Sequence, residues 1–286
     1  MALATRFGRK LTSYRSNSPL DDDQIRTVAP SIFATEAHEA RSARYTHIPT
    51  SKVLGHLRTE GFQPFFVAQA VTRDESRQGH AKHMIRLRHT NTIAAAEANE
   101  IILLNSHDGT SSYQMLAGML RFVCTNGMVV GDSIEEVRVR HSGNVVDDVI
   151  EGAFTVLDQF EEVEAGRDEM KALTMSPDEQ QLFAHHALAM RYDEPSAAPI
   201  TAGQLLHTRR REDDQQDLWT TFNRVQENAT RGGQRGTARN GGRTRTRAVK
   251  GIDSNLKLNR ALWNLAEGLA ALKNGRSIEE ILTPAS

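Results

Sequence analysis

The sequence has only one cysteine, Cys124, in 286 residues. An intramolecular disulfide and a cysteine-rich zinc site are therefore excluded, and a lone thiol fits a reducing compartment. Long apolar runs are also missing, because no stretch approaches the roughly 18 consecutive apolar residues that a membrane span needs. Residues 1–10 lack the apolar centre of a signal peptide. We therefore expect a cytoplasmic protein that has no membrane partner.

An excess of charge of either sign is absent as well, since the formal net charge is −1. The chain as a whole has no electrostatic attraction for nucleic acid, so any such attraction must come from a local patch. Charged residues make up 25% of the chain and hydrophobic residues 38%, a composition that allows a folded core. The length is sufficient for one large domain or two modest ones.

Strand signals dominate residues 1–143. A helix is expected just after Ser18-Pro19 and another at residues 51–60. Apolar runs and alternating patterns then predict strands, and Asp108-Gly109 and Asn126-Gly127 are typical of tight turns between antiparallel neighbours. The strands are expected at residues 62–71, 83–89, 100–106, 110–116, 121–125, 128–130 and 135–141.

Helical periodicity replaces the strand pattern near Gly143. Apolar residues recur at helical spacing over residues 145–173. The fold class is therefore α+β: an N-terminal antiparallel sheet with a few helices, then a C-terminal, mainly helical part with an exposed Arg/Gly-rich loop. The parts span residues 1–143 and 144–286, and they could form two domains or pack as one. Further helices are expected at residues 177–190, 217–230 and 255–273, with a last one capped by Ser277.

Residues 231–250 are the most unusual segment, with seven basic residues, five glycines and no acid. We expect an exposed loop or hairpin between two helices, since nothing in it can bury a core. Guanidinium groups bind phosphate oxygens through paired hydrogen bonds, and glycines let a backbone approach a ligand closely. If residues 243–247 are extended, three guanidiniums lie along one edge about 7 Å apart. The candidate nucleic-acid-binding residues are Arg231, Arg235, Arg239, Arg243, Thr244, Arg245, Thr246, Arg247 and Lys250.

Two structural explanations compete with phosphate binding. The arginines of residues 231–250 could simply be solvated, or they could pair with nearby acids at positions 213, 214 and 217. Single-strand binding would also need aromatic platforms for base stacking, and the segment has none. Trp219, Phe222 and Trp263 flank it, but each falls in an apolar helical stripe, so we assign all three to the core.

The turn at residues 105–113 gathers many polar side chains. Asn105, His107, Asp108 and Ser111 form a possible polar ligand site, because side chains at a loop tip can face a partner. In a catalytic alternative His107 acts as a general base oriented by Asp108, with Ser111 or Cys124 as nucleophile. Adjacent turn residues rarely reach that geometry, so we predict no catalytic residue here.

No metal site or cofactor is predicted either. His80 and His83 would face opposite sides of a strand and could not share a metal ion there, whereas on a helix they could. A His-Glu-x-x-His motif, a phosphate-binding P-loop and a Rossmann glycine pattern are all missing. We therefore favour a protein that is not an enzyme.

Eight blocks of sequence are distinctive and spread over nearly the whole chain, at residues 60–66, 101–115, 123–127, 135–141, 217–221, 226–228, 241–249 and 257–263. In these blocks the sequence resembles a phage and plasmid protein family of unknown function, the YfjQ and YafZ group. The resemblance implies a gene carried by prophages or plasmids, often near DNA-metabolism and antirestriction genes, and it implies no specific activity.

Three functions are consistent with these features. The first, which we favour, is a mobile-element accessory protein that binds nucleic acid, for example in single-strand binding or annealing during transfer or recombination. Such a protein could form a homo-oligomer. The second is an anti-defence or antirestriction protein that binds a host defence or recombination protein. The third is a hydrolase or nuclease that uses His107 and Asp108.

Overall fold

The computed structural model describes residues 3–5, 11–41, 45–90, 97–121, 126–130, 137–139, 145–192 and 194–282. By its internal contacts the chain divides into two compact units, which we call the sheet unit and the helical unit. The sheet unit comprises Met1–Gly127, Ile134–Phe160 and Lys250–Ile252, and the helical unit comprises Met128–Ser133, Glu161–Val249 and Asp253–Ser286.

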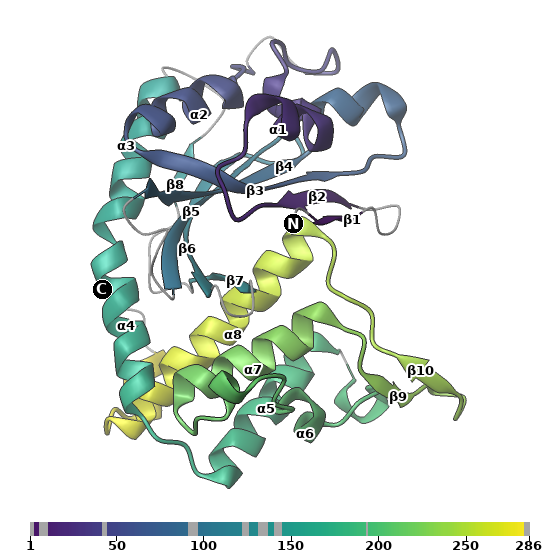
Figure 1. Ribbon diagram of the computed structural model, residues 1–286, viewed down its shortest axis with the longest axis vertical. Helices are drawn as coiled ribbons and strands as arrows, with labels where there is room; N and C mark the ends of the chain where they lie inside the picture. Colours follow the sequence, from purple (N-terminus) through teal and green to yellow (C-terminus); the bar gives the residue numbers. More distant parts are fainter. Residues whose placement is uncertain are drawn as a thin grey trace. The chain divides into compact units, whose positions relative to one another are not determined.

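An antiparallel sheet of eight strands carries the first half of the chain (Figure 1). The strand order is β1 to β7 along the sequence, and β8 pairs with β6. This arrangement confirms the predicted α+β class with an N-terminal antiparallel sheet. The strands are β1 (Leu3–Thr5), β2 (Leu11–Arg15), β3 (Phe62–Ala70), β4 (His83–His89), β5 (Glu97–Asn105), β6 (Tyr113–Arg121), β7 (Asn126–Val129) and β8 (Val137–Val139).

Strands β4, β5 and β6 are buried on both faces, although β4 has the alternating sequence of a half-exposed strand. One face of β4 carries Ile85 and Leu87, and the other carries Arg86 and Arg88. The two arginines are buried because Glu100, on the neighbouring β5, accepts a hydrogen bond of 2.7 Å from Arg86 and one of 2.8 Å from Arg88. A buried charge is tolerated when it is paired in this way.

Helices cover the sheet within the sheet unit. The helices α1 (Asp22–Val28) and α2 (Thr50–Thr59) pack on β3, and α3 (Val145–Asp158) packs on β6 and β8 (Figure 1). The first helix is present as predicted but starts later than Ser18-Pro19, because Asp21 is its N-cap and accepts a hydrogen bond from the backbone N–H of Gln24 at 2.8 Å. Two short 3-10 helices, η1 (Pro30–Phe33) and η2 (Glu75–His80), complete this cover.

The helical unit is built around α7 (Leu218–Arg231), which is buried over residues 218–230. Trp219 and Phe222 of α7 pack against Trp263, so their predicted place in the core is confirmed. A two-stranded hairpin follows α7 and precedes α8. The other elements are α4 (Phe160–Ala172), α5 (Pro177–Arg191), η4 (Pro195–Ala197), α6 (Ala202–Leu205), η5 (Arg211–Asp213), β9 (Arg235–Thr237), β10 (Arg243–Arg245), α8 (Ile252–Lys273) and α9 (Ile278–Leu282).

The structure corrects several expected boundaries. The strand expected at residues 110–116 begins later, at Tyr113, and continues to Arg121, because Ser106 and Asp108 bind the backbone N–H groups of residues 111 and 110 and extend the turn. The helix expected at residues 145–173 is interrupted at Gln159, between α3 and α4. Strands β1 and β2 were not expected at all. The residues of the strand expected at 121–125 lie, after Arg121, outside the described part.

Asn126-Gly127 is not a turn, contrary to the sequence prediction. Both residues belong to β7. The glycine serves close packing instead, because a Cβ atom on Gly127 would lie 2.1 Å from the guanidinium of Arg86 and 3.4 Å from that of Arg15. The position therefore needs glycine for space beside two arginines.

Candidate functional site

The Arg/Gly-rich segment folds as an antiparallel hairpin of β9 and β10. Arg245 lies opposite Arg235, and Arg243 lies opposite Thr237. Side chains opposite each other share a face of the ladder, and so do side chains two residues apart. The three arginines therefore lie on one face, which we call the arginine face.

The arginine face is exposed to solvent. Arg235, Arg243 and Arg245 are all in the exposed class, whereas Gly236 and Thr244 on the opposite face are partly covered. An open recess of about 550 Å³ lies along these five residues. Among the described residues no carboxylate forms an ion pair with any of the three guanidiniums, and Arg245 donates one long hydrogen bond, of 3.4 Å, to the carbonyl of Gly233.

The opposite face of the hairpin is anchored within the helical unit. The N–H of Thr237 donates to the carbonyl of Pro199 at 2.9 Å, and Gln204 of α6 donates to the carbonyl of Arg235 at 2.8 Å. Gly236 makes this docking possible, because a Cβ atom there would lie 2.0 Å from the Pro199 oxygen. These anchoring contacts involve the backbone of β9 and none of the three arginine side chains, and Figure 1 shows where the hairpin of β9 and β10 lies.

The hinge of the hairpin also depends on a glycine. Gly232 has a φ of 69°, and a Cβ atom there would lie 2.6 Å from the backbone of Arg247 and Ala248. Thr246 is buried at this hinge, where its hydroxyl accepts a hydrogen bond from the N–H of Gln234 at 3.0 Å. Thr246 therefore supports the hairpin, although the sequence also suggested it as a phosphate ligand.

Two of the arginines singled out in the sequence already have acidic partners. Arg231 forms an ion pair of 2.8 Å with Glu227 on α7, and Arg239 forms one of 2.6 Å with Glu194. Arg247 is exposed and, like Lys250, lies beyond the last residue of β10. The arginine face is thus a smaller set than the nine residues proposed from the sequence.

The acids at positions 213, 214 and 217 do not neutralise the arginine face. Asp213 is buried and pairs with Arg210 at 2.6 Å, while Asp217 caps α7 by accepting from the N–H of Thr220 at 2.7 Å. Glu227 likewise binds Arg210, at 2.7 Å, in addition to Arg231. Burial raises the pKa of Glu227, but its hydrogen bonds with Arg210 and Arg231 outweigh burial and leave this pKa below its usual value.

The polar turn is in a different environment from the one the sequence suggested. Asn105, His107 and Asp108 are buried, and Ser111 is partly buried. Asp108 accepts hydrogen bonds from the N–H (3.0 Å) and the hydroxyl (2.6 Å) of Thr110, so it shapes the turn. Instead of facing outward, the turn is the centre of a buried polar cluster.

Five imidazoles gather around this turn, and we call them the histidine cluster: His38, His47, His80, His83 and His107. The ring of His107 lies 4.4 Å from that of His47 and 5.3 Å from that of His83, between centroids. Those of His38 and His80 are 5.3 Å apart. Burial lowers the pKa of His83 to about 4, and burial together with the proximity of His80 lowers the pKa of His47.

A metal site, a membrane span and a cysteine nucleophile are the other features to consider. No group of three or more His, Cys, Asp or Glu side chains able to hold a metal ion occurs among the described residues. None of the described helices combines the length and apolar character needed to cross a membrane. Cys124, the alternative nucleophile, lies outside the described residues.

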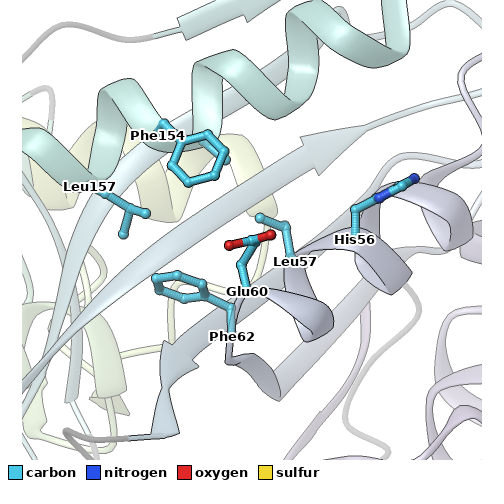
Figure 2. A pocket seen from close by; sticks show the side chains of 7 residues that line it. His56, Leu57, Glu60, Phe62, Phe154 and Leu157 are labelled. Atoms are coloured by element: carbon cyan, nitrogen blue, oxygen red, sulfur yellow. The ribbon is translucent and has the colours of Figure 1, made fainter.

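A small pocket opens between α2, the start of β3 and α3 (Figure 2). Leu57, Phe62, Phe154 and Leu157 give it an apolar lining, and Figure 2 shows Glu60 among them. Its volume is about 40 Å³. Sites for small molecules usually measure about 300–1,000 Å³, so this pocket is too small for a substrate or cofactor.

The structure therefore describes an α+β protein with an exposed arginine hairpin and a buried histidine cluster. A family model for a domain of unknown function, DUF932, matches residues 37–263, and the chain belongs to this family. It is 53% identical to the UPF0380 protein YfjQ and 52% identical to the UPF0380 protein YafZ, both of Escherichia coli K12. Each alignment covers 93% of this chain and 97% of the relative. No solved structure matches.

Proposed function

We propose that the protein binds nucleic acid through its phosphate backbone and that the arginine face is the contact surface. The observation that carries this proposal is the exposed, acid-free grouping of Arg235, Arg243 and Arg245 on one face of an anchored hairpin. Three guanidiniums so close together repel one another, and phosphate groups would relieve that repulsion. Because the net charge of the chain is −1, binding depends on this local patch.

The contact is with phosphates and not with bases. Trp219, Phe222 and Trp263 are buried in the core of the helical unit and offer no surface for base stacking. Arginine side chains without base contacts bind all sequences about equally. The protein would then act as a nucleic-acid-binding accessory factor of a mobile element, the context that the resemblance to phage and plasmid proteins implies.

The test is fluorescence anisotropy with labelled single-stranded and double-stranded DNA of several sequences, at 50 and 200 mM salt. With three phosphate contacts the affinity for duplex should fall roughly 40-fold between these concentrations, since the logarithm of affinity falls with a slope of about −0.9 per contact. Replacing the three arginines of the arginine face with alanine should remove most binding and reduce the slope by about three.

A matched control removes the same charge elsewhere in the helical unit. Arg211, Lys257 and Arg276 are exposed and lie outside the hairpin, and their replacement with alanine should change affinity less than about threefold. Equal losses of DNA affinity in both triple variants would mean that the effect comes from net charge and not from the arginine face. If no binding occurs at 50 mM salt, the proposal fails, and a host defence protein becomes the partner to search for.

A further inference from the structure

A directed chain of hydrogen bonds runs through the histidine cluster. Its first link is Asn105, whose amide donates to the hydroxyl of Thr50 at 3.0 Å. The hydroxyls of Thr50 and Ser31 lie 2.9 Å from Nε2 and 2.8 Å from Nδ1 of His83. At the far end the hydroxyl of Ser31 donates to the side-chain oxygen of Gln69 at 2.7 Å.

The direction of this chain determines the protonation of His83. Because the Ser31 hydroxyl gives its proton to Gln69, it must accept from Nδ1 of His83. A neutral imidazole then has a bare Nε2, which accepts the proton of the Thr50 hydroxyl. A second proton on His83 would make Nε2 a donor that faces the Thr50 hydroxyl, to which the amide of Asn105 already donates. The proton of the Thr50 hydroxyl would then lose its acceptor.

Two neighbouring imidazoles, those of His47 and His80, have a buried Nδ1 atom. Nε2 of His47 lies 3.1 Å from the carbonyl oxygen of Ala34. Its Nδ1 atom is buried and has no hydrogen-bond partner in the described part of the chain. The Nδ1 atom of His80 is in the same situation. Backbone hydrogen bonds also join the turn to its neighbours. The N–H of His38 donates to the carbonyl of His107, and the N–H of His107 donates to the carbonyl of His80.

We propose that His83, within the histidine cluster, is an acid-sensitive latch, which holds residues 31–41 and 45–50 against β4 and the 105–111 turn when its imidazole is neutral and releases them when it is protonated. The sheet itself, from β3 to β6, stays folded when the latch opens, because its ladder of backbone pairs does not involve these side chains. The latch lies wholly in the sheet unit and does not depend on nucleic-acid binding.

The sign of the pH effect follows from the depressed pKa of His83, about 4 against an ordinary value of 6.5. A neutral native imidazole stabilises the closed latch fully above pH 6.5, and this stability is lost as the pH falls from 6.5 towards 4. At pH 5 the opening equilibrium should be favoured about 30-fold relative to neutral pH. The charged and titratable groups around the cluster are Glu36, Arg41, Tyr45, Asp74 and Asp108, and the acids Glu36 and Asp108 moderate the effect by raising the pKa of His47 and His83 respectively.

Hydrogen exchange of the full chain, measured by mass spectrometry at pH 7.5 and 5.0 and corrected for intrinsic rates, tests the latch. Peptides covering residues 31–41, 45–50 and 105–111 should lose protection about 30-fold at pH 5.0. Peptides covering residues 84–88 and 98–104 should keep theirs. The latch is disproved if residues 31–41 and 45–50 are equally protected at both pH values, or if all of these peptides lose protection together.

A variant separates the latch from ordinary acid unfolding. In His83→Gln the amide can still donate to Ser31 and accept from Thr50 but takes up no proton, so opening should shift to lower pH. His56→Gln, at an exposed position on α2, is the matched control and should behave like the unmodified chain. An unchanged pH midpoint in a folded His83→Gln rules the proposal out. If that variant does not fold, NMR titration of the imidazole protons of the unmodified chain decides, since an ordinary pKa for His83 would exclude the latch.

Discussion

Arg235 lies directly opposite Arg245 in the β9–β10 ladder, and both side chains are exposed. Like charges at opposite positions destabilise a ladder, and a hairpin with three paired positions has little stability of its own. The hairpin is held by its anchors at Pro199 and Gln204. The fold thus maintains a repulsive pair that an anion would neutralise. A substitution that removes this repulsion can therefore stabilise the hairpin while it weakens the proposed binding.

Arg245→Glu should therefore stabilise the hairpin and weaken binding. A glutamate opposite Arg235 converts repulsion into a cross-strand ion pair, worth about 0.2–1 kcal/mol. Thermal unfolding should show an equal or higher melting temperature, while anisotropy should show an affinity for DNA at least about tenfold lower. Arg276→Glu, the same change at an exposed site outside the hairpin, should leave affinity almost unchanged. Retained binding in Arg245→Glu would contradict the assignment of the arginine face.

Gly236→Ala should weaken binding without removing any charge. The new Cβ atom would lie 2.0 Å from the oxygen and 2.8 Å from the carbon of the Pro199 carbonyl, and these backbone atoms cannot swing aside. The hairpin should then detach, so exchange of the Thr237 amide should accelerate and DNA affinity should fall several-fold. Gly166→Ala is the control, because nothing lies within 4 Å of its added Cβ. A protected Thr237 amide in Gly236→Ala would show that the anchor tolerates the substitution.

Features built from neighbouring residues could be predicted from the sequence. The helix predicted at residues 217–230 and the burial of Trp219, Phe222 and Trp263 follow from helical periodicity. A helix just after Ser18-Pro19 was also predicted from local signals, and α1 is found there, although it begins at Asp22. The arginine hairpin is also local, since the strands β9 and β10 lie within one short segment and its composition excludes a core. In each case the relevant contacts join residues that are close in the chain.

Features built from distant segments could not be predicted. The histidine cluster joins His38, His47, His80, His83 and His107 from separate loops, a 3-10 helix and a strand, so no spacing in the sequence marks it. On a strand His80 and His83 would face opposite sides, whereas on a helix they could lie together. In the structure His80 ends η2 and His83 begins β4, and both contribute to the same cluster. Tertiary packing decides such contacts, and pattern analysis has no access to it.

Glu100→Gln should destabilise the sheet unit strongly. Burial raises the pKa of Glu100, but Arg86, Arg88 and Arg15 outweigh burial and leave this pKa below its usual value. Removing the carboxylate charge leaves buried guanidiniums uncompensated, which costs about 3–5 kcal/mol of the free energy of unfolding. Urea unfolding should show this loss, and Glu75→Gln at an exposed site should not.

The same carboxylate should give the sheet unit a pH dependence of its own. A depressed pKa means that the contribution of Glu100 is present above pH 4.5, its ordinary pKa, and is lost as the pH falls through the lowered value. The difference in stability between the unmodified chain and Glu100→Gln should therefore shrink below about pH 4.5. A constant difference down to pH 3 would mean that Glu100 acts by its shape and not by its charge.

Gly127→Ala tests whether this glycine is required for packing or for a turn. Its added Cβ would lie 2.1 Å from the guanidinium of Arg86, which is held by Glu100 and cannot move freely. Overpacking of this kind costs about 1–3 kcal/mol of the free energy of unfolding. In an Arg86→Lys background the guanidinium is absent while the charge beside Glu100 remains, so the same substitution should cost less than about 0.5 kcal/mol. Equal costs in the two backgrounds, measured by urea unfolding, would mean that the contact with Arg86 is incidental.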